Sequence, residues 1–427
     1  MAGYFGKGRS IAIPNIDIGN LTEPLGLKSY TTAERDALTG LRTGDTIYNS
    51  TTASIEFYNG VNWLGTNLVP TINSITGNIY EGVATTLTLS LTNATDTVDV
   101  KYYEGATLLA TDSGVTVTSG SATSTVPSAV YGQTAGDTIS IQVVSQDGTP
   151  SPNSVNKAVT APPTGGTITT SGDYRIHTFT SSGSFVVSSE LTDVEYLVIA
   201  GGGGASIQST YGGGGGGAGG YRSSVVGESS GGGASAESTL LITSGSYTVT
   251  VGAGGAGDTV SSGTGTNGQD STFSTITSIG GGAGGDFGQA GGSGGGGRGT
   301  NASTREGGAG TSGQGFNGGT SNHKSGGGGG GAGEVGQNTV NDTTAGAGGD
   351  GVSSSIDGSA TYRAGGGGGG DGSSGGSGGA GGLGGGGAGT NGVGGNGTTN
   401  TGGGGGGGDT AGGGNGGSGI VIVRYQL

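Results

Sequence analysis

Two segments decide the fold of this chain: residues 193–204, DVEYLVIAGGGG, and residues 418–427, SGIVIVRYQL. Each joins glycines to an apolar run that is typical of a buried β-strand. In the first segment Val194, Tyr196 and Val198 fall at every second position, as one face of a strand requires. The last segment follows the nearest earlier strand candidate by about 140 residues. An apolar strand in that place needs partners, so the sequence in between has to fold back on itself.

Glycine tracts dominate this intervening sequence, and two interpretations of them are open. The longest tracts are Gly212–Gly217, Gly326–Gly331, Gly365–Gly370 and Gly402–Gly408. Gly/Ser-rich chains are normally flexible coils, which is the first interpretation. The second is an ordered array of extended polyglycine helices with the threefold geometry of polyproline II. The terminal strand favours the array, because a coil would not return that strand to its partners.

The array has a narrow energetic margin. A polyproline-II-like helix has no internal hydrogen bonds, so every N–H and C=O must bond to a neighbouring segment or to water. Only glycine lets two backbones approach closely, and ordering it costs roughly 0.5–1 kcal/mol more than ordering alanine. Each net hydrogen bond returns only about 0.5–1.5 kcal/mol. We therefore expect many helices packed together, stabilised by apolar burial in the flanking strands.

Composition divides the chain into two parts. Glycine accounts for 113 of the 427 residues; residues 1–161 contain 17 of these, and the other 96 lie in residues 162–427. Cysteine is absent, which excludes disulfides, thiol chemistry and cysteine-ligated metal clusters. Collagen is excluded as well, because it needs glycine at every third residue among abundant prolines, and this chain has 8 prolines.

Charge and hydropathy limit the partners. The net charge is −15 and no cluster of Lys and Arg occurs, so a phosphate backbone would be repelled and no nucleic acid is expected as a partner. No apolar stretch is long enough for a membrane span. The first residues lack the apolar region of a secretory signal, so we expect synthesis and assembly inside a cell.

The N-terminal part predicts three units. Residues 1–30 are interpreted as an attachment arm, with a floppy terminus as the alternative. Residues 31–66 predict a small α+β module, in which Thr31 and Glu34 form a capping box at the start of a short helix. Two β-like runs follow this helix. Trp63, the single tryptophan, is expected to close the core of the module.

Residues 67–161 predict an Ig-like β-sandwich. Strand candidates alternate apolar and polar residues at period two, and turn residues separate them at roughly 8–12-residue spacing. The residues expected on the inward faces are Leu87, Leu89, Leu91, Val98, Val100, Tyr102, Ile139, Ile141 and Val143. Residues 162–427 then form a β-rich, glycine-rich domain, which opens with a predicted hairpin around Ser182-Gly183 in YRIHTFTSSGSFVV. The fold class is therefore mainly β.

Two groups of segments resemble known families. TTAERDAL, TGDTIYNSTTASIEFYNGVNW resembles a short module that recurs in bacteriophage fibre and tail proteins. HTFTSSGSFVV, VEYLVIAGGGG, GSYTVTVGAGG and GGSGIVIVRY, in that order, resemble the glycine-rich domain of phage tail fibres and adhesins. That resemblance implies a β-rich base, packed polyglycine-II helices and connecting loops that contact the host surface. It also implies a homotrimer.

The loops are the expected place of specificity, because loops on a rigid scaffold carry recognition. Aromatic faces suit sugar rings, and arginine suits carboxylates or phosphates. The loop residues expected to contact a receptor are Tyr211, Phe287, Arg298, Arg305, Phe316, His323 and Lys324. Two Tyr-Arg pairs are expected to be structural because their form repeats, namely Tyr221 with Arg222 and Tyr362 with Arg363.

Motifs for catalysis or cofactors carry little weight here. G-x-G-x-x-G occurs by chance in tracts this rich in glycine, and no strand–loop–helix context supports a dinucleotide site. GTNGQDSTF, with Asp270, resembles one calcium-binding repeat, but that architecture needs tandem copies. We expect no enzyme activity, no cofactor and no metal.

The sequence therefore favours a structural virion protein, a bacteriophage tail-fibre subunit that mediates attachment to the host. The expected partners are further copies of the chain, other virion proteins bound through the N-terminus, and a bacterial surface glycan or outer-membrane protein. A neck or head fibre, or a capsid decoration protein without a receptor role, is the alternative. A polysaccharide depolymerase would need paired carboxylates, which the scattered acidic residues do not suggest. A bacterial surface adhesin is disfavoured because no secretion signal is visible.

Overall fold

The computed structural model describes residues 29–427, apart from 50–53, 59–62, 66–68, 95–96, 146–147, 261–262, 302 and 373–375. The attachment arm expected at residues 1–30 lies outside the described residues, except for Ser29 and Tyr30. Strands account for 36% of the structure and helices for 3%, so the predicted mainly β class is confirmed. Within these described ranges, no helix has the length and apolarity that a membrane crossing requires.

The chain forms two compact units. The first comprises Met1–Thr76, Thr88–Ser124 and Ser140–Asn156, and the second comprises Gly77–Leu87, Thr125–Ile139 and Lys157–Leu427. Each unit is described by itself below. The division into four domains remains a prediction.

A short helix and four strands form the N-terminal module. The helix α1 spans Thr32–Asp36 and has the predicted capping box: Glu34 N–H donates to Thr31 Oγ1 (3.3 Å), and Thr31 N–H donates to Glu34 Oε2 (2.8 Å). The sheet has the order β1-β2-β3-β4, with strands at Ser29–Tyr30, Thr46–Asn49, Ser54–Tyr58 and Trp63–Gly65. Trp63 begins β4, and its side chain lies outside the described part of the structure.

An eight-stranded sheet of order β5-β7-β10-β9-β8-β11-β12-β6 follows. Its strands are β5 (Thr71–Thr76), β6 (Ile79–Tyr80), β7 (Thr86–Thr92), β8 (Thr97–Glu104), β9 (Thr107–Thr118), β10 (Ser121–Thr125), β11 (Thr138–Ser145) and β12 (Val155–Thr160). A helix, α2, spans Ser128–Tyr131. All nine side chains predicted on inward faces are buried, which confirms the period-two interpretation of these strands.

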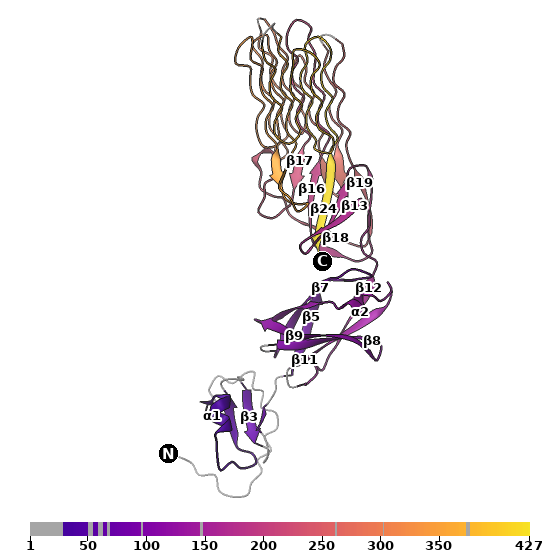
Figure 1. Ribbon diagram of the computed structural model, residues 1–427, viewed down its shortest axis with the longest axis vertical. Coiled ribbons are helices and arrows are strands. Elements are labelled where there is room, and N and C mark those ends of the chain that lie inside the picture. Colours follow the sequence, from indigo (N-terminus) through magenta and orange to yellow (C-terminus); the bar gives the residue numbers. More distant parts are fainter. Residues whose placement is uncertain are drawn as a thin grey trace. The chain divides into compact units, whose positions relative to one another are not determined.

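The glycine-rich part begins with a base of strands (Figure 1). One sheet has the order β13-β14-β24-β16-β17, with β18 also paired to β16, and a second has the order β15-β19-β20-β21. These strands are β13 (Thr167–Ser171), β14 (Tyr174–Phe179), β15 (Gly183–Val187), β16 (Leu191–Ile199), β17 (Tyr221–Ser223), β18 (Leu240–Ile242), β19 (Gly245–Thr250), β20 (Ser271–Phe273), β21 (Ile276–Ser278) and β24 (Ile420–Gln426). A hairpin of β22 (Val352–Ser354) and β23 (Thr361–Arg363) and a 3₁₀ turn at Gly231–Gly233 complete the elements.

The hairpin predicted around Ser182-Gly183 is wrong. Both strands exist, but β14 pairs with β13 and β24, whereas β15 pairs with β19 in the other sheet. Phe179 of β14 and Phe185 of β15 are buried in the same apolar cluster. The two strands therefore lie in different sheets, and their aromatic side chains pack in one shared apolar core.

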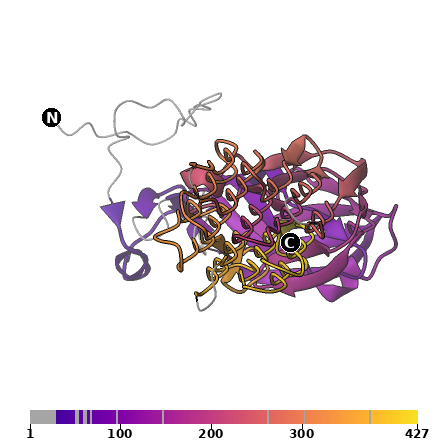
Figure 2. The ribbon, with the colours of Figure 1, turned by 90° about the horizontal axis from the view of Figure 1, so that it is seen from above.

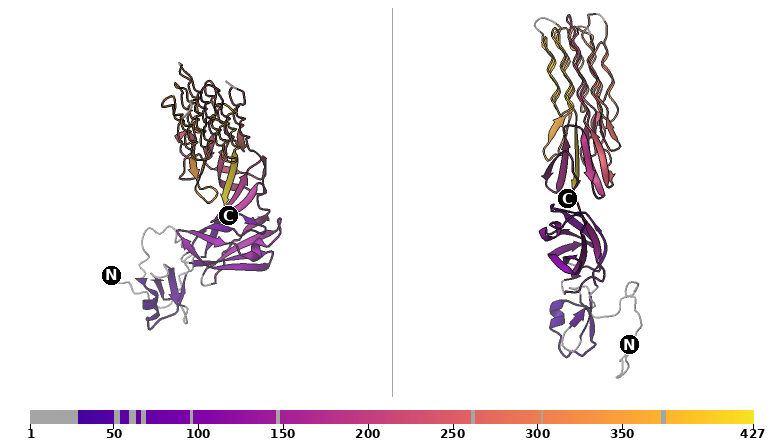
Figure 3. Two further views of the ribbon diagram at one scale, coloured as in Figure 1. Left: turned by 45° about the horizontal axis from the view of Figure 1, so that its top comes forward. Right: turned by 90° about the vertical axis from the view of Figure 1, so that its right-hand side faces the viewer.

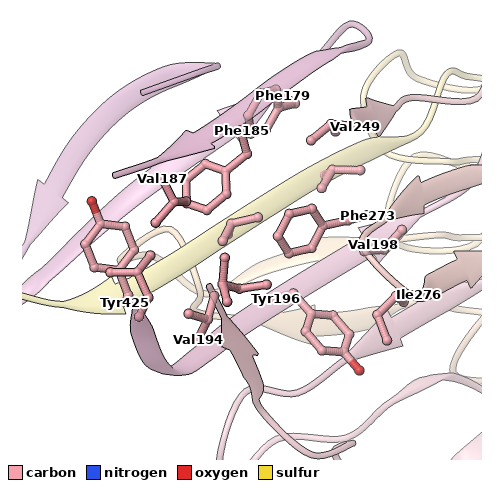
Figure 4. Packing of buried hydrophobic residues seen from close by; sticks show 14 of the residues in the cluster. Phe179, Phe185, Val187, Val194, Tyr196, Val198, Val249, Phe273, Ile276 and Tyr425 are labelled. Carbon is pink, nitrogen blue, oxygen red and sulfur yellow. The ribbon is translucent and has the colours of Figure 1, made fainter. Parts of the chain in front are cut away.

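The terminal strand β24 lies in the middle of its sheet, between β14 and β16. Its alternate residues enter two separate apolar layers. Val421, Val423 and Tyr425 belong to a cluster that also contains Val194, Tyr196 and Val198 of β16 (Figure 4). Ile420 and Ile422 belong to a second cluster with Leu197 and Ile199. Both faces of β16 and β24 are therefore buried, which explains the continuous apolar runs Tyr196–Ile199 and Ile420–Val423.

Glycine-rich segments between residues 200 and 419, here called the glycine segments, run side by side away from the base strands (Figures 1 and 3) and are seen end-on in Figure 2. Their hydrogen bonds join different segments and repeat every three residues. Backbone N–H groups of Gly212, Gly215 and Ala218 donate to the carbonyls of Lys324, Gly327 and Gly330. Those of Gly213, Gly216 and Gly219 donate to Gly408, Gly405 and Gly402. Residues 212–219 thus donate in turn to residues 324–330, which run in the same direction, and to residues 402–408, which run in the opposite direction.

Close approach explains the requirement for glycine in these segments. An added Cβ at Gly215 would overlap the carbonyl oxygen of Gly367, and one at Gly367 would overlap that of Gly405. Neither residue has a positive φ, so the constraint comes from the neighbouring backbone and not from the local conformation. The coil interpretation of the tracts therefore fails for the described residues, since the segments form a dense, hydrogen-bonded bundle.

Candidate functional site

The candidate site lies at the ends of the glycine segments that point away from the base. Residues 200–206 follow β16 and leave the base, and residues 212–220 return to β17, so the turn at 207–211 lies at the far end. Residues 279–285 leave β21 in the same way, and residues 345–351 lead into β22. We call the turns at this end the distal loops; those considered below are 207–211, 286–288, 298–305 without 302, 321–325 and 340–344.

Backbone hydrogen bonds hold three distal loops against one another. Gly212, directly after Tyr211, donates to the carbonyl of Lys324 (2.8 Å). Gly299 donates to the carbonyl of Gly212 (2.7 Å), and Thr300 donates to that of His323 (2.7 Å). Tyr211, Arg298, His323 and Lys324 therefore come from loops that are far apart in sequence and adjacent in space.

Asp286 connects two of the predicted residues. Its Oδ1 lies 2.9 Å from Arg298 Nη2, and its Oδ2 accepts a hydrogen bond from Arg305 Nη1 at 2.9 Å. The guanidinium carbon of Arg305 lies 5.2 Å from the ring centroid of Phe287, in a cation–π contact. Phe287 itself is 50% exposed. Four side chains from two loops thus form one patch of an aromatic ring, two guanidinium groups and a carboxylate.

A second acidic residue, Asp342, organises His323 and Lys324. Its Oδ1 accepts the backbone N–H of Lys324 (3.2 Å) and lies 3.3 Å from His323 Nδ1, and its Oδ2 lies 3.7 Å from Lys324 Nζ. The backbone hydrogen bond from Lys324 and the contact with His323 lower the pKa of Asp342, so this carboxylate stays ionised. All three side chains keep substantial exposure to solvent.

The remaining predicted residues lie at the base end. Phe316 donates its backbone N–H to Gly331 and follows Gln314, whose carbonyl accepts the N–H of Tyr221 in β17. Tyr221 is fully buried in the apolar cluster under β16. The sequence placed Phe316 with the receptor-contact residues, but the structure separates it from the distal loops.

The two Tyr-Arg pairs have different surroundings. Arg222 donates from Nε and Nη2 to the two carboxylate oxygens of Glu237 (2.8 and 2.6 Å), which raises the pKa of the guanidinium. Arg363 is buried and donates to Asp357 (2.6 Å). Tyr362, in contrast, is 50% exposed. Both arginines thus sit in ion pairs at the base of the glycine segments.

Sequence reasoning missed the two acidic residues that organise the distal patches. Asp286 and Asp342 were not singled out, because an isolated aspartate in a polar loop has no distinctive pattern. The available signal was position: Asp286 directly precedes Phe287, and the two residues together interrupt a glycine tract. Asp270, considered as a calcium ligand, accepts the backbone N–H of Gly280 (2.8 Å) and so serves as a backbone partner.

No metal-binding group of side chains occurs in the described ranges. Groups of three or more His, Asp or Glu side chains that could hold a metal ion do not occur among those residues. His177 is far from the distal loops, in β14, where its Nδ1–H donates to the carbonyl of Gly165 (2.8 Å). The distal loops offer an aromatic face, guanidinium groups and carboxylates, which are groups that can stack on and hydrogen-bond to a ligand.

Comparison with known proteins agrees with the glycine-rich composition of residues 178–426. No curated protein matches the chain. Residues 178–426 match the model of a family described as a glycine-rich domain. The match begins in β14 and ends in β24, so it takes in β16, all the glycine segments and the distal loops. Because it covers more than half of the sequence, the chain belongs to this glycine-rich domain family.

Proposed function

We propose that this chain is a bacteriophage fibre subunit that attaches the particle to a bacterial surface through the distal loops. The observation that carries the proposal is that six of the seven residues predicted from the sequence to contact a receptor lie at one end of the glycine segments. They are Tyr211, Phe287, Arg298, Arg305, His323 and Lys324, and neighbouring backbone hydrogen bonds hold their loops together. Aromatic and cationic side chains on a rigid support are suited to recognising a surface.

We propose further that the glycine segments are polyglycine-II helices. Such a helix has three residues per turn and no internal hydrogen bonds, so successive N–H groups point to three neighbours in rotation. The N–H groups of Gly215, Gly216 and Gly217 donate to the carbonyls of Gly327, Gly405 and Gly282, which lie in three different segments, and this rotation supports the geometry. Hydrogen–deuterium exchange tests it. We expect slow exchange throughout residues 212–220, and exchange as fast as in an unstructured peptide would contradict it.

The rest of the chain has supporting roles in this proposal. The strands between residues 67 and 161 are an Ig-like spacer, and the N-terminal residues dock on other virion proteins. The protein is a homotrimer located in the virion and assembled in the host cytoplasm. It has no enzymatic activity and binds no nucleic acid, for which the net charge of −15 is the support.

Binding of the full-length protein to host cells tests the attachment role. A variant with Tyr211→Ala, His323→Ala and Lys324→Ala removes three distal side chains and leaves the glycines intact. We expect this variant to lose at least tenfold in cell binding while retaining its circular dichroism spectrum. The matched control is Phe316→Ala with Tyr362→Ala, which changes two aromatic residues at the base end.

Two results would contradict the attachment role. The first is cell binding by the distal variant that equals binding by the unchanged protein. The second is an equal loss in the distal variant and in the base-end control, which would indicate a general effect on folding. Immunogold labelling of the particle provides an independent measurement, because a tail-fibre subunit and a head decoration protein differ in location.

A further inference from the structure

We infer that Asp286, Phe287, Arg298 and Arg305 form a saccharide-binding subsite, in which the Phe287 ring stacks on a pyranose and the charged groups bond to its hydroxyls. This inference rests on the proposed attachment function and names the ligand class for one patch of the distal loops. It uses contacts that neither the family match nor the sequence assigns.

The ring of Phe287 is the stacking surface. It is 50% exposed, and the guanidinium of Arg305 lies over it at 5.2 Å from the centroid. The cation–π contact restrains the ring, so ligand binding causes only a small further loss of side-chain conformational entropy. The face of an aromatic ring carries partial negative charge, which attracts the polarised C–H groups on the apolar side of a pyranose. Exposure of the phenylalanine ring to water is unfavourable, so a ligand that covers the ring gains free energy.

The charged groups beside the ring match sugar hydroxyls. A carboxylate accepts hydrogen bonds at two oxygens, and a guanidinium offers five N–H donors in a planar fork. Asp286, whose side chain is 40% exposed, stands between Arg298 and Arg305 at 2.9 Å from each. A hydroxyl can therefore donate to the carboxylate and accept from an adjacent guanidinium at the same time. Vicinal hydroxyls of a pyranose have the spacing for this double contact.

The backbone holds these side chains in place before any ligand arrives. Arg298 donates its N–H to the carbonyl of Gly285 (2.8 Å), and Gly288 donates to that of Glu306 (2.9 Å). Arg305 and Ser321 exchange a pair of backbone hydrogen bonds (2.7 and 2.9 Å). Both loops are thus fixed at their ends, and a preorganised site binds more tightly because less ordering accompanies binding.

The composition of the patch favours a saccharide over a protein receptor. A stable protein interface buries about 800 Å² on each partner, with a desolvated apolar centre. Here one exposed ring is surrounded by three charged side chains. Such a mixture of one apolar face and several hydrogen-bonding groups is suited to a single sugar unit.

Saturation-transfer NMR on the full-length protein tests the subsite. The probes are methyl glycosides of glucose, galactose, N-acetylglucosamine and glucuronic acid. We expect at least one probe to receive saturation on the C–H groups of one ring face. Phe287→Leu should reduce this signal at least tenfold and Phe287→Tyr should preserve it. The matched control Phe316→Leu, at the base end, should leave it unchanged.

Other outcomes would overturn the subsite. Absence of saturation for all four probes would do so, as would an equal signal from Phe287→Leu and the unchanged protein. Circular dichroism of each variant identifies misfolding, and Phe287→Tyr keeps the test valid because it retains the ring and its support.

Treated host cells separate this inference from the attachment function. Periodate cleaves the vicinal diols of sugars, whereas protease removes protein receptors. Binding that is lost only after periodate treatment supports the subsite. Binding that is lost only after protease treatment, and that is unaffected by Phe287→Leu, keeps the attachment function and overturns the subsite. If a probe receives saturation but the protein binds no host cells, the subsite is supported and the attachment function is overturned.

Discussion

Glu195 and Arg424 face each other across strands β16 and β24 and form an ion pair, with Arg424 Nε 2.5 Å from Glu195 Oε2. The exposed fractions are 6% for the Glu195 side chain and 14% for that of Arg424. The other carboxylate oxygen of Glu195 accepts the backbone N–H of Val226 (2.9 Å), and the Arg424 guanidinium lies 4.5 Å from the ring centroid of Tyr174. This pair joins the first and last parts of the glycine-rich domain.

Breaking the pair should destabilise the glycine-rich domain. Arg424→Met leaves a buried carboxylate without its partner, which typically costs about 3–5 kcal/mol. We expect a reduction of the free energy of unfolding in this range, measured by urea titration followed by circular dichroism. The double variant Glu195→Gln with Arg424→Met removes both charges and should recover part of the loss. A double variant that is less stable than Arg424→Met would contradict this explanation.

Apolar burial by the terminal strand should be essential to the bundle. Ile422 is fully buried between β14 and β16, and Ile422→Ala removes three side-chain carbon atoms from the second apolar cluster. Substitutions of this kind cost about 2–5 kcal/mol. The control is Leu241→Ala, since Leu241 is 62% exposed and its loss should change the free energy of unfolding by less than about 0.5 kcal/mol. Equal effects of both variants would refute the role of β24.

Close packing of backbones predicts a strong difference between glycines. Gly215→Ala places a Cβ on the carbonyl oxygen of Gly367, and relief of that overlap has to separate two glycine segments. Overpacking costs about 1–3 kcal/mol and more where the backbone cannot move. We expect a lower melting temperature and faster amide exchange in residues 212–220.

Gly392→Ala is the matched control for this substitution. An added Cβ at Gly392 meets nothing nearer than Thr390 Oγ1 at 3.9 Å, and its φ is not positive. The melting temperature should therefore stay close to that of the unchanged protein. A comparable fall in both variants would contradict the overlap explanation, because alanine at an unobstructed position without a positive φ restricts the unfolded chain and should not destabilise the fold.

Acid should destabilise the base through His177. Burial lowers the pKa of this imidazole from 6.5 to about 4, and the ring is packed between Phe185 and Tyr425. Between these two pKa values the unfolded chain binds a proton that the folded chain does not bind. The free energy of unfolding therefore falls as the pH decreases from about 6.5 to about 4, by roughly 3 kcal/mol in total.

Urea titrations at several pH values measure this effect. His177→Gln removes the titrating group, so the difference in stability between this variant and the unchanged protein should shrink as the pH falls through that range. Carboxylates titrate in both proteins and cancel in the comparison. A difference that stays constant from pH 7 to pH 4 would contradict the assignment to His177.

Several features of the fold were predictable because they depend on local pattern. Thr31 and Glu34 form the expected capping box, since both groups lie within one helical turn. Leu87, Leu89 and Leu91 are buried as their alternation indicated, because a strand places every second residue on one face. The apolar terminal strand indicated distant partners, and it pairs with β14 and β16.

Other features depended on contacts between distant segments. The strands on either side of Ser182 belong to different sheets. Their pairing partners, β24 and β19, are distant in sequence, so the local pattern could not indicate them. The loop containing Phe316 turned toward the base, although its composition resembles that of the distal loops. Asp286 forms ion pairs with Arg298 and Arg305, and these contacts exist only because the fold brings the two loops together.

The amino-acid sequence by itself determined the mainly β class, the buried faces of the strands and the need for backbones without Cβ atoms. These properties follow from side-chain alternation and from glycine, which act within a few residues. Only the tertiary structure decided which glycine segments lie side by side and which loops share the distal end. Glycine has no side chain to encode a partner, so the neighbours of each segment follow from the closure of the strands at the base and from satisfying every backbone hydrogen bond together.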